Sequence, residues 1–285
     1  MAWKNVKKRG ERRPRRSRRF RVLVVAAVCG TVAAGGLVAY RAVRGGGPAS
    51  RPVTVDEASR MALSRLTLYQ ASPVAVTLTA SEGGGVVVRV KGVVDYRRHR
   101  AVGSYEVTGP AGTAGTAGAA GVSGPSGRGL IVWDSRGLGL APEPGGVAGP
   151  PWRQAEHVPR AGWSPRAYTK DPLDAGLQLL LQLGADRPDN ALLLAQSGAR
   201  WLGRDRIDGR SYDRFSGPRA QGTPQGARDG GELSPLTYWI GGDGAGEGGL
   251  RRVTMRMPGL GTPATLDLTG RDAAAKIPEA PWLTG

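Results

Sequence analysis

The side chains that most often carry out chemistry are scarce in this sequence. The chain of 285 residues contains one cysteine, Cys29, and two histidines, His99 and His157. Structural zinc sites combine several Cys and His ligands at short spacings, and thiol catalysis needs a cysteine beside a base. His99 lies within Arg97-Arg98-His99-Arg100, a run typical of a solvated turn. The sequence therefore indicates neither a zinc site nor a catalytic thiol.

Three aspartates, Asp205, Asp208 and Asp213, lie close together and could in principle bind a hard cation through their carboxylates. They flank Asp208-Gly209, however, and aspartate is favoured at turns because its side chain hydrogen-bonds to the nearby backbone. The chain has no Gly-x-Ser-x-Gly nucleophile elbow and no phosphate-binding Gly-x4-Gly-Lys-Ser/Thr loop. The glycines at 241–244 join two expected strands, whereas a dinucleotide fingerprint must open a helix. We expect no catalytic residue, no cofactor and no metal ion.

Seven tryptophans are the remaining candidates for ligand contact. Trp133, Trp201 and Trp239 fall within expected strands, and aromatic side chains on a concave sheet can bind sugars or acyl chains. Buried aromatic side chains also fill the core between helices and sheet, because each removes a large apolar surface from water. Both interpretations remain open for these three residues.

Three helices are expected from capping and apolar spacing. Thr54 followed by Glu57 forms a capping box, and Asp171-Pro172 places proline at a first helical position. A third helix is expected to begin at Pro188. Their apolar positions are Val55, Ala58, Ala62, Leu66 and Tyr69 in the first, Leu173, Leu177, Leu180 and Leu181 in the second, and Leu192, Leu193 and Ala195 in the third.

Alternating apolar and polar residues predict strands along the rest of the chain. The first two, at 74–79 and 86–91, are joined by a glycine turn at 83–85. Further strands are expected at 105–107, 130–133, 200–207, 211–215, 236–240, 251–257 and 264–269. Residues 108–129 and 217–235 are rich in Gly and other small or polar residues, so we expect flexible loops there. The predicted fold class is α+β, a curved antiparallel β-sheet packed on a few helices.

A transmembrane helix is predicted at 22–43. The segment from Val22 to Tyr40 has no charge. At about 1.5 Å per residue it spans about 28 Å, close to the roughly 30 Å of a bilayer's hydrocarbon core. A cleaved signal peptide is the alternative, although the apolar stretch is longer than is usual for one.

The distribution of charge predicts the orientation of this span in the membrane. Residues 1–44 carry 13 basic and 1 acidic side chains, a net charge of +12, and the other residues carry 27 and 22, a net charge of +5. A basic excess before a span stays in the cytoplasm. We expect a basic cytoplasmic tail at 1–21, a linker at 44–52 and an extracytoplasmic domain at 53–285. Because most of the net basic charge lies in the tail, nucleic acid is not an expected partner.

The second half of the chain resembles a known family in three sequence segments. They are Trp201-Leu-Gly-Arg-Asp-Arg-Ile-Asp-Gly-Arg-Ser-Tyr, Leu236-Thr-Tyr-Trp-Ile and Leu250-Arg-Arg-Val. They are similar to the way in which the LolA-like lipoprotein-carrier superfamily, with its mycobacterial LppX/LprG-type lipoproteins, ends its sheet. The resemblance covers about 53–269. It implies a strongly curved antiparallel half-barrel closed by helices, with an apolar cavity for acyl chains. A membrane span here replaces the family's lipidated cysteine, which argues against a freely shuttling carrier. Thirty-four arginines against six lysines are compatible with an actinobacterial origin.

The alternation places one set of apolar side chains on a single sheet face, opposite the stripe of the second helix. The candidate cavity residues are Val76, Leu78, Val86, Val88, Val90, Trp133, Leu177, Leu180 and Trp239. We predict that the domain binds a lipid or another apolar ligand. If the two surfaces close fully on each other, they form only a core. The alternative is a non-catalytic protein-interaction or signalling-sensor domain with a protein partner in the cell envelope.

Overall fold

The computed structural model describes residues 50–82, 85–109, 127–218, 234–242 and 249–279, which all belong to the unit Ala49–Gly285. The predicted tail, transmembrane helix and most of the linker, residues 1–49, lie outside the described residues. So do most of the two predicted loops, at 110–126 and 219–233. Among the described residues, no helix is both long enough and apolar enough to cross a membrane.

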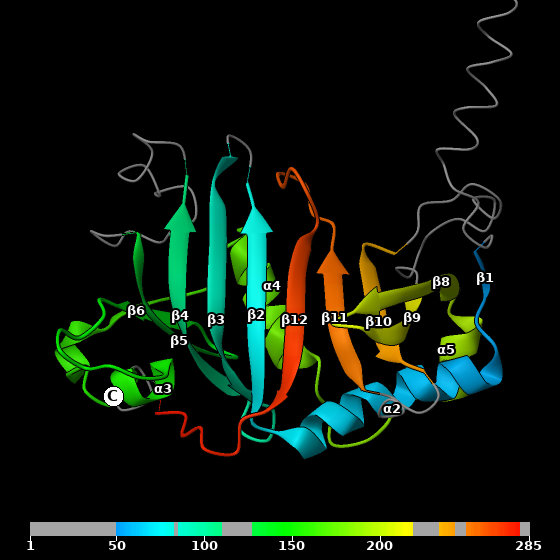
Figure 1. Ribbon diagram of the computed structural model, residues 1–285, viewed down its shortest axis with the longest axis horizontal. Coiled ribbons are helices and arrows are strands. Elements are labelled where there is room, and N and C mark those ends of the chain that lie inside the picture. The colour runs from blue at the N-terminus through cyan, green and yellow to red at the C-terminus, as the bar shows by residue number, and fades with distance from the viewer. Residues whose placement is uncertain (1–49, 83–84, 110–126, 219–233, 243–248, 280–285) are drawn as a thin grey trace, which may run out of the picture. The chain divides into compact units, whose positions relative to one another are not determined.

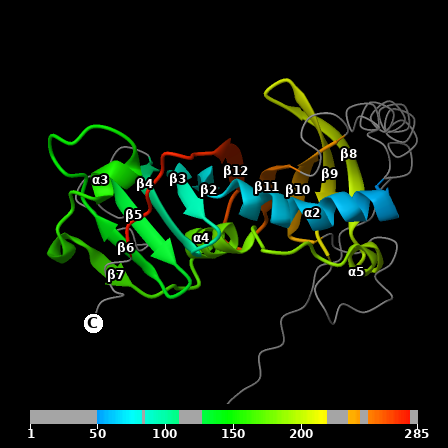
Figure 2. The same cartoon turned by 90° about the horizontal axis from the view of Figure 1, so that it is seen from below.

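In the described part of the chain, twelve strands form one sheet in the order β1-β8-β9-β10-β11-β12-β2-β3-β4-β5-β6-β7 (Figure 1). Every pair of neighbours is antiparallel. The strands are β1 (Arg51–Pro52), β2 (Val74–Ser81), β3 (Val87–Asp95), β4 (Arg100–Thr108), β5 (Arg128–Asp134), β6 (Leu138–Ala141), β7 (Ser164–Arg166), β8 (Arg200–Ile207), β9 (Arg210–Ser216), β10 (Leu236–Gly241), β11 (Leu250–Met255) and β12 (Ala264–Arg271). The sheet is open and curled (Figure 2), which confirms the predicted α+β class with a large antiparallel sheet.

Local sequence signals explain most of these strands. Buried and half-buried residues alternate strictly along β2, as its apolar alternation predicts. The β8–β9 hairpin turns at Asp208 and Gly209, which both have positive φ values, 51° and 76°. Two successive left-handed residues are the geometry of a type I′ turn, which matches the right-handed twist of the flanking strands. Strands β1, β6 and β7 were not predicted, because Arg-Pro, Leu-Gly-Leu-Ala and Ser-Pro-Arg are too short to show an alternation, and β1 lies within the expected linker.

The helices are α2 (Val55–Ala71), α3 (Pro151–Ala155), α4 (Pro172–Gln182) and α5 (Ala191–Gln196), with a 3-10 turn at Arg160–Gly162. The predicted capping box of α2 is present, and Arg51 adds two hydrogen bonds of 2.8 and 2.7 Å to the Glu57 carboxylate. Asp171 caps α4 by accepting a hydrogen bond from Leu173 N at 2.7 Å. The third helix begins at Ala191, after an Asn190 cap, rather than at Pro188. Helix α3 was not predicted.

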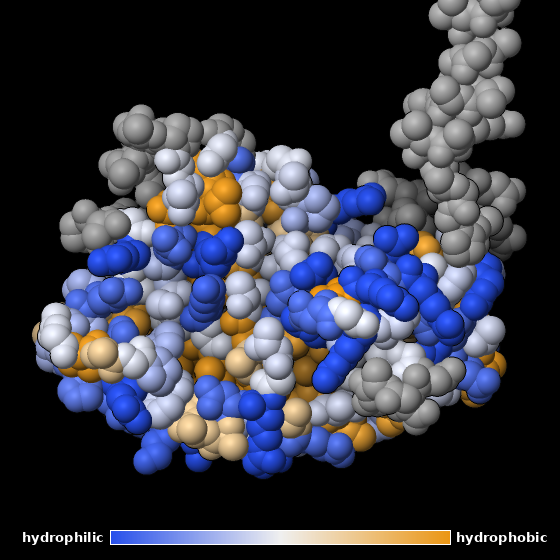
Figure 3. All heavy atoms as spheres, viewed as in Figure 1, coloured by the Kyte–Doolittle hydropathy of each residue, from blue (hydrophilic) through white to orange (hydrophobic). Residues whose placement is uncertain are grey.

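Helices α2, α4 and α5 pack on one face of the sheet and form the main core with it, whereas α3 packs on the other face over β3 to β5 (Figures 1 and 2). On the face seen in Figure 3, hydrophilic side chains gather over the part of the sheet formed by β8 to β11. An antiparallel sheet with one solvated face commonly looks like this.

The expected apolar faces of two helices need correction. In α5 the expected Ala195 packs against the main core, but Leu192 and Leu193 are 61% and 63% exposed and Leu194 packs there in their place. Helix α5 has only six residues, Ala191–Gln196, so only a narrow side of it can face the core. Val55, at the start of α2, is 56% exposed. By contrast, all four expected apolar positions of α4 are buried.

Candidate functional site

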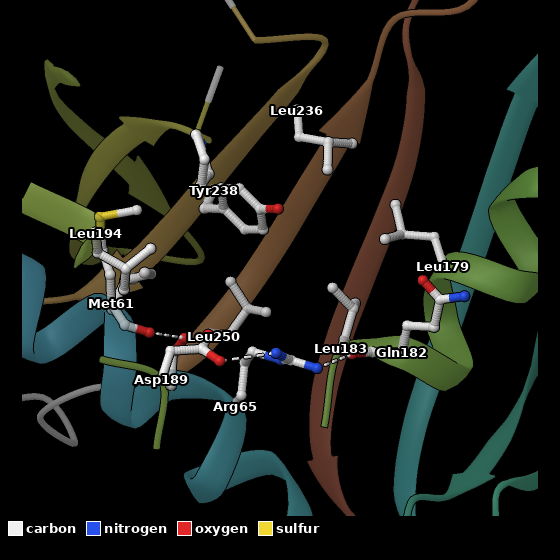
Figure 4. A pocket seen from close by; sticks show the side chains of 13 residues that line it. Met61, Arg65, Leu179, Gln182, Leu183, Asp189, Leu194, Leu236, Tyr238 and Leu250 are labelled. Carbon is white, nitrogen blue, oxygen red and sulfur yellow. Dashed lines mark hydrogen bonds and ion pairs between the residues drawn. The ribbon is translucent and has the colours of Figure 1, made fainter. Parts of the chain in front are cut away.

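The helices and the sheet do not close completely on each other: a cavity of about 320 Å³ remains between α2, α4 and α5 on one side and β10 and β11 on the other (Figure 4). It is lined by Met61, Ser64, Arg65, Leu179, Gln182, Leu183, Asp189, Leu194, Pro218, Leu236, Tyr238, Ile240 and Leu250.

Every second residue of β10 faces the cavity, because side chains alternate between the two faces of a β-strand. Leu236, Tyr238 and Ile240 alternate along β10, so their side chains share the face that looks toward the helices. Leu250 pairs with Ile240 across the ladder and extends this apolar surface onto β11. The sheet therefore offers a continuous apolar wall with one aromatic hydroxyl.

The helix wall is equally apolar. Met61 and Ser64 are one turn apart on α2, and the Ser64 hydroxyl donates a 2.7 Å hydrogen bond to the Met61 carbonyl oxygen, so its polarity is satisfied within the helix. Leu179 and Leu183 contribute from α4 and its end, and Leu194 from α5. Of these leucines, Leu183 is buried and Leu179 and Leu194 are partly buried, which leaves room at the wall.

Charged groups lie at one side of the cavity. The Arg65 guanidinium donates one 2.9 Å hydrogen bond to the Asp189 carboxylate and another to the Gln182 carbonyl oxygen (Figure 4). Two backbone hydrogen bonds lie beside them, and in both a nitrogen of this segment donates to α2: Ala185 N to the Arg65 carbonyl oxygen and Asp189 N to that of Ala62. These contacts fasten the segment between α4 and α5 onto α2, and they define the polar edge of the cavity.

Tyr238 is the polar group on the sheet wall, and its ring points into the cavity in Figure 4. Burial raises the pKa of its hydroxyl to about 12, while Arg65 lowers the pKa and Asp189 raises it by smaller amounts. The hydroxyl is therefore protonated at neutral pH and can donate a hydrogen bond to a bound molecule.

The structure places the cavity residues expected from sequence elsewhere. Seven side chains are buried in the main core, namely Val76, Leu78, Val88, Val90, Trp133, Leu177 and Leu180, and Val86 packs against it. The Trp133 indole nitrogen donates a 3.2 Å hydrogen bond to the Leu177 carbonyl oxygen. These side chains do not line the cavity, and ligand contact by any of them stays a prediction.

Trp239 lies on the opposite face of β10 from the cavity, in a small cluster with Ile207 and Tyr212. Its neighbours Tyr238 and Ile240 line the cavity instead. The signal that could have found them is the alternation within Leu236-Thr-Tyr-Trp-Ile, which puts Leu236, Tyr238 and Ile240 on one face.

The three aspartates around the β8–β9 turn bind arginine and tryptophan side chains. Asp213 is buried and accepts hydrogen bonds from Arg60 (2.8 Å), Arg204 (3.0 Å) and the Trp201 indole (3.1 Å). Asp208 pairs with Arg251 at 2.7 Å, and Asp205 accepts a hydrogen bond from the Trp239 indole. Among the described residues, no group of three potential metal ligands is found. Arg60 attaches α2 to the sheet through Asp213, and the Trp201 indole joins β8 to the same carboxylate.

No protein-family model matches this chain, and no curated protein sequence is found to be similar to it. Solved structures that are similar include an uncharacterized conserved protein from Thermus thermophilus, with 10% identity, a TM-score of 0.31 and coverage of 73% of this chain and 82% of that one. Another is the LolA superfamily protein NE2245 from Nitrosomonas europaea, with 13% identity, a TM-score of 0.28 and coverage of 76% and 92%. At these TM-scores neither likeness is a basis for assigning function.

Proposed function

We propose that the cavity between the helices and the sheet binds an apolar molecule, such as the acyl chain of a lipid. The observation that supports this is the cavity itself, whose walls are mainly aliphatic on both sides, with the Tyr238 hydroxyl on the sheet wall and the charged groups at one edge. Small-molecule sites typically combine such an apolar lining with a few fixed polar groups, and they have volumes of about 300–1,000 Å³. A cavity of about 320 Å³ lies at the lower end of this range.

The expected driving force is the removal of apolar surface from water, at about 25 cal/mol per Å². An apolar ligand would cover Leu236, Leu250 and Leu179 without leaving a charge unpaired, because Arg65 already has Asp189 as its partner. A binding role, rather than a catalytic one, agrees with this lining.

We also propose that the chain is anchored in the cell membrane by residues 22–43, with the described unit outside the cytoplasm, as a tethered relative of the LppX/LprG-type carriers. The support is the uncharged segment from Val22 to Tyr40 behind a basic tail. Protease added to intact protoplasts is expected to remove the unit, and its protection would contradict this topology.

Ligand binding is tested by filling the cavity. Leu179→Trp adds a large side chain at a half-buried position of the cavity wall, so it is expected to abolish uptake of a fluorescent fatty acid by the full chain. Leu192→Trp makes the same substitution at an exposed position on α5 and is the matched control. Equal uptake by both variants, measured by fluorescence titration, would contradict the proposal.

A protein-interaction role is the second candidate, and it rests on exposed leucines. Leu63 of α2 is 46% exposed, and Leu192 and Leu193 of α5, the helix that packs beside α2, are more so. Exposed apolar groups that lie together often mark a protein contact. In that case, cross-linking in cells is expected to capture one defined envelope protein, and changing Leu192 and Leu193 to serine is expected to abolish its capture.

A further inference from the structure

A second hollow adjoins the apolar cavity. It has a volume of about 550 Å³ and is lined by groups that include Arg97 and His99 from the β3–β4 turn, Gln178 from α4, and Asp186. Arg65 and Gln182 line both spaces. The hydrogen bond between the Arg65 guanidinium and the Gln182 carbonyl oxygen therefore stands at the boundary between an apolar space and a polar one.

Arg97 is the cation in this hollow that can bind a further anion. Its guanidinium lies 5.9 Å from the centre of the Tyr69 ring and donates a 3.2 Å hydrogen bond to the Gln70 carbonyl oxygen. Among the residues that the structure describes, no carboxylate lies within 4.0 Å of the Arg97 guanidinium nitrogens. The other charges at the hollow have partners: Arg65 pairs with Asp189 at 2.9 Å, and Asp186 lies 3.9 Å from Arg187.

The turn that carries Arg97 is firmly placed. The Asp95 carboxylate accepts hydrogen bonds from Arg97 N at 3.0 Å and from the Ser72 hydroxyl at 3.0 Å. His99 closes the turn in the left-handed region, with φ of 49°, and is one of the residues that line the hollow. Two nitrogen-bearing side chains, those of Arg97 and His99, are thus held beside the boundary that Arg65 forms.

We propose that the ligand of this protein is an anionic amphiphile, whose apolar chain occupies the cavity and whose carboxylate or phosphate head binds Arg97 in the adjoining hollow. This inference rests on the proposed function. A guanidinium matches both oxyanions with two parallel hydrogen bonds, and such charge-assisted bonds are stronger than neutral ones. Arg65, between the two spaces, sets the point at which the chain of the ligand ends and its head begins.

The test compares one fluorescent fatty acid with its methyl ester, which keeps the chain and removes the charge. The full chain, held in an amphipol, is expected to bind the acid about tenfold more tightly than the ester. Arg97→Gln is expected to bring the affinity for the acid down to that for the ester without changing ester binding. Arg98→Gln is the matched control, because Arg98 is the next residue of the same turn, lies near Asp95 and is outside the hollow.

The possible outcomes separate the two proposals. Equal binding of acid and ester, unchanged by Arg97→Gln, would overturn the anionic-head inference and leave apolar binding intact. Binding of neither probe would overturn both. Inorganic phosphate alone tests for a free anion as the occupant: an Arg97-dependent affinity for phosphate that exceeds the affinity for the fatty acid would also overturn the amphiphile proposal.

Discussion

Two buried aspartates each attach a helix to its surroundings. Asp174 of α4 accepts hydrogen bonds from both terminal nitrogens of Arg166, at 2.7 and 2.8 Å, and from the backbone nitrogen and hydroxyl of Thr169. Asp213 accepts one hydrogen bond from Arg60 of α2, at 2.8 Å, and others from Arg204 and the Trp201 indole. Burial alone would raise the pKa of each carboxyl, but the hydrogen bonds that each accepts outweigh it, and both pKa values lie below the ordinary 3.8.

Asp174→Asn is expected to lower the free energy of unfolding by about 3 kcal/mol, because removing one partner of a buried ion pair leaves the other without its counter-charge. Asp186→Asn is the control, because Asp186 is an exposed aspartate whose nearest cation, Arg187, is exposed too. Urea denaturation measures both changes. Similar midpoints for the two variants would show that the Arg166 pair adds nothing.

The same two carboxyls predict how stability depends on pH. Since their folded-state pKa values are lower than 3.8, the unfolded chain binds more protons than the folded one below that pH. Their contribution is fully present above about pH 5 and is lost as the pH falls past the ordinary 3.8 and through the folded-state pKa values. Between pH 5 and pH 2, the unfolding free energy of the Asp174→Asn/Asp213→Asn variant is expected to fall less steeply than that of the wild type, as followed by circular dichroism.

Gly184, just after α4, is needed for close packing. A Cβ atom at this position would lie 2.5 Å from Cγ of the fully buried Tyr96 ring. Gly184→Ala is therefore expected to cost about 1–3 kcal/mol, the usual range for overpacking. Gly145→Ala meets nothing within 4 Å and is the matched control. Thermal unfolding at the same temperature for both variants would contradict this account.

At the scale of single elements, helix caps and strand alternation are local signals, and they allowed α2, α4 and strands such as β8 and β9 to be predicted from the sequence. The short elements β6, β7 and α3 carry no such signal, and their structure depends on the neighbours that they pair or pack with. An apolar cavity was expected, but its position and lining could not be predicted because they depend on the spacing between α2 and β10, which is set by packing of residues far apart in the sequence. Trp239 illustrates this: its aromatic character suggested ligand contact, but its register places it on the far face of β10.

Helix α5 offers a direct check of which face packs. Leu194 lines the cavity and packs on the main core, whereas Leu193 is exposed. Leu194→Ala is expected to lose about 2 kcal/mol of unfolding free energy, at the lower end of core leucine truncations because the residue is only partly buried. Leu193→Ala is expected to change it by less than about 0.5 kcal/mol. The reverse order in urea denaturation would show that the helix is rotated.

At the scale of the whole described unit, one pairing joins two groups of strands. Strands β2 to β7 lie on one side of β12 and strands β1 and β8 to β11 on the other, and β12 pairs with both β11 and β2. The β12–β2 ladder brings Leu266 opposite Leu78, and both are fully buried. Ending the chain before Ala264 would leave long unpaired edges on β2 and β11, which favour edge-to-edge association. Such a truncated chain is expected to aggregate, as size-exclusion chromatography would show. A monodisperse monomer would contradict the central role of β12.

The position of β12 in the sheet also affects the order in which the sheet can form during synthesis. The chain is synthesised from its N-terminus at about 5–20 residues per second, and ladders between distant segments form slowly. Strand β12 lies between β11 and β2, so this part of the sheet can form only after residues 264–271 have been synthesised. Until Ala264–Arg271 arrives, β2 to β7 and β8 to β11 have no common ladder to join them. The two groups of strands can therefore join into one continuous sheet only after residues 264–271 have been made.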